Sequence, residues 1–178
     1  MARALAVLIA AILAAPAAAA AQDAKSADLA KQLAQLLDEK KLDAIAAADA
    51  ANPDAFVAAL YFPGTQLLAV SAKYSAPQLI NDKLAKKDYR DIYVDLSAAS
   101  VAGSKVFIMD TFADGLVLKP KGDAPADSVE RGSATTAFDG EPKKAKISDA
   151  DYAKSYDECE AAYVKILQAL ITKLKSGT

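Results

Sequence analysis

Few side chains in this sequence are suited to catalysis. The chain has 178 residues, with no histidine, no tryptophan and a single cysteine. Without histidine, Ser-His-Asp and Cys-His arrangements, histidine general bases and histidine-ligated zinc are excluded. Neither a G-x-G-x-x-G motif nor a phosphate-binding P-loop motif occurs. Catalysis would have to use carboxylates, lysines, tyrosines or the lone cysteine, so the sequence favours a non-catalytic role.

The lone cysteine, Cys159, has two interpretations. An unpaired cysteine in an exported protein is either a reactive thiol, free or in an intermolecular disulfide, or a small buried apolar residue. Cys159 falls on the apolar stripe of the last predicted helix. Its neighbours Glu158 and Glu160 would raise the pKa of the thiol rather than lower it. We favour the structural interpretation.

Asp110 and Asp114 stand close together and offer oxygen ligands for a hard cation such as calcium. Their spacing does not match the calcium-binding loop of an EF-hand. We interpret Asp110 as the end of a strand and Asp114 as a turn residue before Gly115. The sequence therefore predicts no metal site.

Lys73, Tyr74 and Tyr93 are the candidate ligand-binding residues. Lys73 is the one charged residue in the stretch 56–74. It marks either the mouth of a cavity or the point at which a strand reaches water. The tyrosines near this stretch either line a pocket or belong to the core with a hydroxyl in water. These tyrosines are Tyr61, Tyr74, Tyr89 and Tyr93.

Residues 1–21 have the features of a secretory signal peptide. Met1-Ala2-Arg3 is a positively charged start, and Leu5 to Ala15 is an apolar run too short to span a bilayer comfortably. Ala19-Ala20-Ala21 fits the cleavage pattern. The alternative is a retained membrane anchor, against which the alanine-rich cleavage region argues. We predict cleavage after Ala21 and a periplasmic or secreted protein.

The mature chain, residues 22–178, has the length expected of one domain. Loss of Arg3 leaves 20 lysines and arginines against 23 acidic residues, a net charge of −3. Such mild acidity indicates neither nucleic acid nor an anionic membrane as a partner. The arginines that remain are Arg90 and Arg131, so a phosphate clamp built from arginines is not expected. The sequence predicts no oligomeric state.

The stretch 56–74 is the longest nearly uncharged run of the mature chain, and the fold is predicted to centre on it. Pro63-Gly64 divides it into two apolar arms, which we interpret as an antiparallel hairpin. A short helix starting at Asn52 is the alternative for the first arm. In the second arm both faces of the strand are apolar or small, which predicts packed layers on both sides and burial of Val70 between them.

The remaining elements follow from hydrophobic periodicity, caps and turn signals. A leucine stripe predicts helical structure over 26–49. A capping pattern at Ser75 predicts a helix to about Lys87. Ser148 starts a long amphipathic helix in the same way. Strands are predicted at 91–96, 105–112, 116–118 and, at a sheet edge, 133–138, with a surface loop at 119–131.

This order of elements predicts an α+β domain around a five- or six-stranded antiparallel sheet or a split barrel. Over about residues 54–140, the segments FVAALYF, QLLAVSAKY, PQLINDKLAKK, DIYVDL and KVFIMDTF resemble in their order the split barrel of the pyridoxamine-phosphate-oxidase-like flavin-binding proteins. In that family, basic side chains on a strand and near the following helix hold the flavin phosphate. The resemblance implies this role for Lys73 and Lys83.

Two functions follow from these observations. The first is an exported, non-catalytic module that binds a small molecule or another envelope protein, favoured by the signal peptide and the absence of a catalytic constellation. The second is a flavin- or nucleotide-using, oxidoreductase-like protein on a split barrel, supported by the order of elements. Two separated lysines do not concentrate the positive charge that a flavin phosphate needs. The first function is therefore preferred, and no cofactor is expected.

Overall fold

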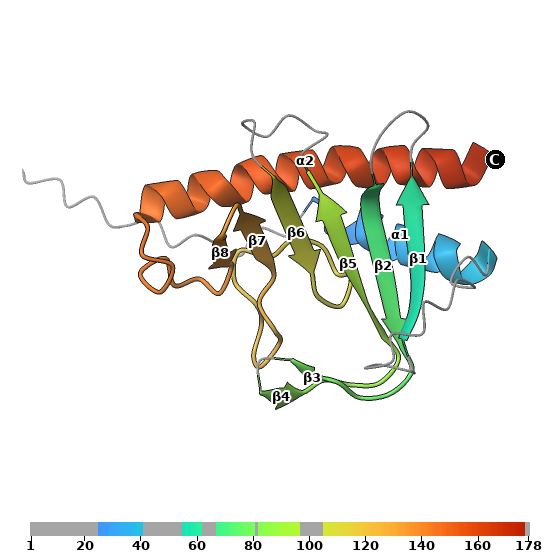
Figure 1. Cartoon of the computed structure of the whole chain (residues 1–178), viewed down its shortest axis with the longest axis horizontal. Helices are drawn as coiled ribbons and strands as arrows, with labels where there is room; N and C mark the ends of the chain where they lie inside the picture. The colour runs from blue at the N-terminus through green and yellow to red at the C-terminus, as the bar shows by residue number, and fades with distance from the viewer. Residues whose placement is uncertain (1–24, 41–54, 62–66, 81, 97–104, 177–178) are drawn as a thin grey trace, which may run out of the picture.

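The computed structural model describes residues 25–40, 55–61, 67–80, 82–96 and 105–176. They form a six-stranded antiparallel sheet in the order β1-β2-β5-β6-β7-β8, a separate two-stranded sheet β3-β4, and two helices. In Figure 1 both helices lie behind the large sheet and the small sheet lies below it. The predicted α+β fold with a six-stranded antiparallel sheet is confirmed. The sheet is open, with β1 and β8 as its edges, and is not a closed barrel.

The boundaries of the elements are as follows. The helices are α1 (Ala27–Lys40) and α2 (Asp149–Ser176). The large sheet contains β1 (Ala55–Tyr61), β2 (Leu67–Tyr74), β5 (Tyr89–Asp95), β6 (Val106–Asp110), β7 (Ser128–Arg131) and β8 (Ala134–Ala137). The small sheet contains β3 (Leu79–Ile80) and β4 (Lys83–Leu84). The predicted hairpin is confirmed, because β1 pairs antiparallel with β2. Its loop at 62–66 and the second half of the predicted helical region, 42–49, lie outside the described residues.

The core lies between the helices and one face of the sheet. Strand alternation directs Ile92 and Val94 of β5 and Ile108 of β6 toward the helices, where each is at most 1% exposed. The helices contribute side chains repeated every three or four residues, among them Leu33, Leu37, Tyr163, Leu167 and Leu170. The predicted start of α2 is confirmed, since the hydroxyl of Ser148 accepts a hydrogen bond from the Asp151 N–H at 3.1 Å.

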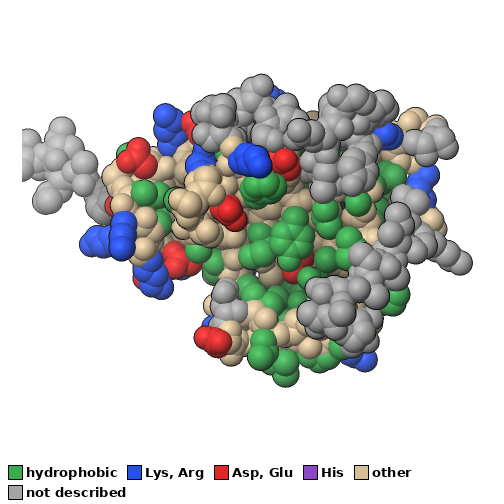
Figure 2. Space-filling view, in the orientation of Figure 1, with side chains coloured by type: hydrophobic (Ala, Val, Ile, Leu, Met, Phe, Trp, Pro, Cys, Tyr) green, Lys and Arg blue, Asp and Glu red, His purple; other side chains and the backbone are tan. Residues whose placement is uncertain are grey.

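The prediction that Val70 is buried between two layers is wrong, because Val70 is half-buried. Among the described residues, helices cover one face of the large sheet. The other face carries Ala59, Val70, Tyr93 and Met109 in neighbouring register positions, and all four are half-buried. Figure 2 shows apolar side chains gathered over this face, which we call the open face. Small and amphipathic side chains on both sides of a strand had suggested a second layer, but they also suit a partly solvated face.

The predicted helix from Ser75 to Lys87 is also wrong. Leu79 pairs with Leu84 across a short hairpin, and the Ala85 N–H donates to the Gln78 carbonyl at 2.7 Å. Asp82 adopts φ 63°, a left-handed conformation that aspartate tolerates in turns. Both leucines, expected on a buried helix face, are more than 70% exposed. The pairing of β3 with β4 therefore overrides the capping pattern.

Two smaller predictions between β6 and β8 need correction. Residues 116–118 form no strand, because the Leu116 N–H donates to the Ser26 hydroxyl and the Val117 N–H to the Asp127 carboxylate. The predicted loop 119–131 ends earlier, at residue 127, because β7 occupies 128–131 and buries Val129 in the core. The predicted edge strand at 133–138 is confirmed as β8.

Candidate ligand-binding cleft

A cleft of about 530 Å³ lies between the small sheet and the loop that precedes β7. One wall is the segment 83–88 and the other is the segment 121–125. Lys83 and Asp123 connect the two walls through an ion pair of 3.1 Å. In Figure 1 the small sheet and this loop both lie below the large sheet. Because these two segments form its walls, the cleft lies outside the main core.

The walls of the cleft carry more positive than negative charge. Its lining contains four lysines and two aspartates, whereas the whole chain has a net charge of −2. These residues are Lys83, Lys86, Lys87, Lys121, Asp88 and Asp123. Within the described part of the chain, Lys86, Lys87 and Lys121 form no ion pair, and all three are exposed. The cleft is therefore locally basic on a mildly acidic protein.

Aromatic rings form the floor of the cleft. Tyr89 stacks on Tyr74 with ring centroids 4.8 Å apart and an interplanar angle of 17°. Phe112 meets Tyr89 at 5.1 Å and 88°, a T-shaped arrangement that aromatic pairs favour. Tyr89 is almost buried, whereas Phe112 is partly exposed and lines the cleft. Phe112 therefore offers the cleft an aromatic surface with a packed support behind it.

The backbone at Phe112 is strained. Phe112 and Ala113 have φ angles of 76° and 49°, in the left-handed region that costs a non-glycine residue about 1–2 kcal/mol. Such strain persists only where the surroundings hold the backbone in place, and it concentrates at functional sites. The strained backbone of Phe112 therefore lies at the cleft and needs contacts that hold the loop in place.

Three buried carboxylates hold the strained loop. Asp91 of β5 accepts the Phe112 N–H at 3.2 Å. Asp127, just before β7, accepts the N–H groups of Thr111 and Val117, both at 2.9 Å. Asp110, the last residue of β6, accepts the N–H groups of Asp114 and Gly115 at 3.1 to 3.2 Å. Three neighbouring strands therefore fix the course of residues 111–117.

The same network reaches both helices. The Tyr163 hydroxyl of α2 donates to Asp110 at 2.7 Å. Ser26, just before α1, donates through its N–H and its hydroxyl to Glu160 of α2, each at 2.8 Å. Gly115 lies so close to Ala27 that a Cβ atom would stand 2.5 Å from the Ala27 nitrogen. The loop is thus built into the contact between α1, α2 and the sheet.

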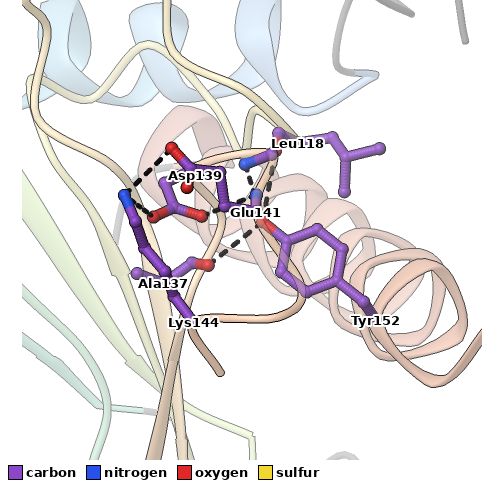
Figure 3. A network of polar contacts seen from close by, with 7 residues as sticks. Leu118, Ala137, Asp139, Glu141, Lys144 and Tyr152 are labelled. Carbon is purple, nitrogen blue, oxygen red and sulfur yellow. Dashed lines mark hydrogen bonds and ion pairs between the residues drawn. The ribbon is translucent and has the colours of Figure 1, made fainter. Parts of the chain in front are cut away.

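Tyr152 fixes the start of the loop that forms the second wall. As Figure 3 shows, its hydroxyl lies beside the carbonyls of Leu118 and Ala137, at 3.5 and 3.1 Å. The same hydroxyl accepts the Gly140 N–H at 2.9 Å. Lys144 bonds nearby to Glu141 at 2.9 Å and holds the turn after β8. Tyr152 therefore ties Leu118, at the base of the wall, to the end of β8 and to α2.

Burial makes the anchoring carboxyl groups hard to ionise. Burial raises the pKa of Asp91 to about 6, although hydrogen bonds from the Phe112 N–H and the Tyr93 hydroxyl act in the opposite direction. Burial also raises the pKa of Asp110, and the charge of Asp114 adds to this effect. The pKa of Asp127 is raised by burial and then by the nearby Asp110. Burial therefore favours the neutral form of Asp110 and of Asp127.

The carboxylate oxygens of Asp110, Asp114 and Asp127 lie within 4.8 Å of one another, a grouping of a kind that can hold a metal ion. Both oxygens of Asp110 and both of Asp127 already accept N–H or O–H donors from the chain. A carboxylate used in this way has little capacity left for a cation. We interpret the cluster as the anchor of the loop.

The three predicted site residues do not all lie together. Tyr74 and Tyr93 are on the open face, and the Tyr93 hydroxyl donates to Asp91 at 3.3 Å. Lys73 points to the opposite, helix-covered face, as strand alternation requires, and bonds to Asp38 of α1 at 2.9 Å. Arg90 bonds to the same carboxylate at 2.8 Å. Tyr74 stacks on Tyr89, which lines the cleft, and ligand binding by Lys73, Tyr74 and Tyr93 stays a prediction.

Sequence reasoning missed the residues that form the cleft. Lys86 and Lys87 fell at the end of a predicted helix that the structure does not form, and Lys83 was named through the family resemblance alone. Phe112 was placed in a strand, and its left-handed backbone has no signal in the sequence. Cys159, in contrast, is buried as predicted, with none of its surface exposed. Burial raises the pKa of its thiol, against the effect of Arg131.

Comparison with known proteins finds no match: no family model, no curated protein and no solved structure is similar to this chain. Among the helices that the structure describes, none combines the length and apolar character needed to cross a membrane.

Proposed function

We propose that the mature protein is an exported, non-catalytic binding module that holds a small molecule in the cleft beside Phe112. The observation that carries the proposal is the strained backbone at Phe112, held by three buried carboxylates so that the ring forms the floor of a 530 Å³ cleft. Three buried acidic groups and two left-handed residues are a costly way to build a loop that has no role. Export rests on the signal-peptide features of residues 1–21.

The placement of the acidic groups supports binding rather than catalysis. Burial raises the pKa of Asp91, Asp110 and Asp127, which are at most 5% exposed, and it also raises the pKa of Asp114, which is exposed but does not line the cleft. The oxygens of the three buried groups bond to the backbone of the loop, so they are positioned to support Phe112 from behind. A general acid or base must reach the reacting group within hydrogen-bond distance, and these carboxyl groups do not reach into the cleft lining.

The experiment is native mass spectrometry of the mature protein purified without denaturation. We expect a small molecule to co-purify with the wild type. The Phe112→Gly variant, which removes the ring and accommodates the positive φ, should lose it. Ala124→Trp, on the exposed wall, should also lose it by obstructing the cleft. Phe107→Ala removes a partly exposed ring from the open face and serves as the matched control.

The outcome that would contradict the proposal is equally specific. If Phe107→Ala lost the bound molecule while Phe112→Gly and Ala124→Trp kept it, the open face rather than the cleft would be the binding site. A protein that carries no small molecule, and whose melting temperature no small-molecule library raises, would favour a protein-binding module instead.

The cleft is not expected to hold a flavin phosphate. The two arginines of the mature chain are bound elsewhere, Arg90 to Ser71 and Asp38 and Arg131 to Glu158. Lysines alone provide point charges without the bidentate geometry that arginine brings to phosphate. Titration of FMN with the mature protein should leave flavin fluorescence unchanged. Saturable quenching at micromolar protein would instead support the oxidoreductase-like alternative.

A further inference from the structure

We propose that the ligand of the cleft is an apolar molecule that carries one carboxylate-type negative charge. This inference rests on the proposed function, since it assigns a chemical class to the molecule that the cleft binds. It uses two properties of the lining that come from different segments: uncompensated lysines on the walls and apolar side chains beside them.

The lysines of the cleft favour a ligand that carries a negative charge. Lys86 lies on one wall and Lys121 on the other, and neither forms an ion pair with another described residue. Lys87 adds a third positive charge, so these three lysines outnumber Asp88, the one aspartate of the lining that is not paired with Lys83. Like charges that face a shared cleft repel one another, and an anion between them relieves this repulsion. Lys83 does not contribute in the same way, because Asp123 already neutralises it at 3.1 Å.

The apolar side chains of the lining favour a ligand that is mostly apolar. Leu84 is 72% exposed although it lies in the cleft wall, and Phe112 is partly exposed on the floor. Ala85, Ala124 and Pro125 complete the apolar part of the lining. A leucine so exposed on a short hairpin is stabilised when a ligand covers it. A purely polar anion such as inorganic phosphate would leave this surface in water.

The lining favours a ligand with a single negative charge over one with a phosphate group. The three free lysines are exposed and stand on two different walls, so they do not form a compact cradle. No arginine is available, since Arg90 and Arg131 are bound away from the cleft. A carboxylate or sulfonate needs fewer converging donors than a phosphate dianion does.

A matched pair of fluorescent probes tests this inference. 8-Anilinonaphthalene-1-sulfonate and N-phenyl-1-naphthylamine share their ring systems, but the first carries a sulfonate and the second is neutral. We expect the anionic probe to bind the mature protein about tenfold more tightly than the neutral one at low salt, and added salt to reduce the difference. Phe112→Gly should weaken the binding of both probes, because both use the aromatic floor.

Lysine variants identify the source of the charge preference. Lys86→Gln combined with Lys87→Gln should weaken the binding of the anionic probe several-fold and leave the neutral probe unchanged. Lys165→Gln, at an exposed position on α2, removes one charge far from the cleft residues in sequence and is the control. Intrinsic melting temperatures should be similar for all three proteins, because these lysines are exposed.

The outcomes separate this inference from the proposed function. Equal affinity for both probes, with both lost in Phe112→Gly, would overturn the charge assignment and leave the cleft as the binding site. Weakening of the anionic probe by Lys165→Gln to the same extent as by the double variant would also overturn it. Binding of both probes that Phe112→Gly does not change would contradict the proposed function itself.

Discussion

Single buried carboxyl groups determine how the stability of this protein depends on pH. Asp91 is 5% exposed, and burial raises its pKa to about 6. In the unfolded chain an aspartate titrates near pH 3.9. Between these values the unfolded state releases a proton that the folded state keeps, so unfolding becomes more favourable as the pH rises. The contribution of Asp91 to the free energy of unfolding is fully present below about pH 4 and is lost as the pH rises through about 6.

We therefore predict that the free energy of unfolding falls between pH 4 and pH 7. Asp91 contributes a slope of at most about 1.4 kcal/mol per pH unit, and the raised pKa of Asp110 acts in the same direction. Urea unfolding at a series of pH values measures this. Asp91→Asn should reduce the slope, because an amide does not titrate in this pH range. The variant should still fold, because the amide oxygen can accept the Phe112 N–H. Asp123→Asn, at a fully exposed position, is the control. Stability that increases toward pH 8 would contradict this account.

At the residue scale the sequence predicted where Cys159 and Asp110 lie in their elements, but not which residues Asp110 contacts. Cys159 and Asp110 were placed correctly, the first on the apolar stripe of a helix and the second at the end of a strand. The role of Asp110 depends on Gly115 and Tyr163, which lie 5 and 53 positions further along the chain. Such contacts follow from how strands and helices are packed together, and periodicity contains no information about them. Asp127 was missed for the same reason.

At the scale of elements, the two faces of the large sheet differ in burial: the helices bury side chains on one face, whereas side chains on the open face are half-buried. Val94 of β5 lies opposite Ala69 of β2, within the core, and is not exposed at all. Val70 of β2 lies opposite Tyr93 on the open face and is half-buried. The same residue type on neighbouring strands therefore provides a matched pair of positions.

We predict that Val94→Asp unfolds the domain and that Val70→Asp does not. A buried carboxylate without a partner costs several kcal/mol, comparable with the roughly 5–15 kcal/mol that stabilises a domain. On the open face the new carboxylate can keep part of its hydration. Circular dichroism and urea unfolding of both variants measure the difference. If Val70→Asp were as destabilising as Val94→Asp, a second layer would have to cover the open face, as the sequence had suggested.

Periodicity predicted those elements whose two faces differ or whose caps are intact. The stripes of α1 and α2 and the alternation of β5 and β6 gave the correct element types. It failed at 75–87, where β3 and β4 pair as a short hairpin and no helix forms. It also failed at 116–118, where carboxylate and hydroxyl acceptors take the N–H groups that a strand would use. The lysines of the cleft depend on that hairpin, so the error in the fold concealed the site.

At the scale of the whole molecule, the sheet and the two helices form two layers, and the small hairpin β3-β4 is appended to them. The network from Asp110 to Tyr163 and from Ser26 to Glu160 joins the sheet to both helices. The hairpin β3-β4 contributes to the cleft and exposes Leu79 and Leu84. An exposed hairpin such as β3-β4 beside a well-packed core is well suited to admit and release a ligand.

Export is a prediction about the whole chain. We expect the mature protein to start at Gln22, because residues 19–21 match the small-residue cleavage pattern. Intact-mass measurement of protein recovered from the periplasm or the medium tests this. A product that keeps Met1 and fractionates with the cytoplasm or the membrane would contradict it. Cleavage after Ala21 would remove none of the described residues, which begin at residue 25.

The most direct test of the central claim is a crystal structure of the mature protein purified with its ligand. The account predicts electron density for a small molecule between the segments 83–88 and 121–125, in contact with Phe112 and with a negatively charged group near Lys86, Lys87 or Lys121. Density on the open face over Tyr93 and Met109, with the cleft filled by solvent, would contradict it.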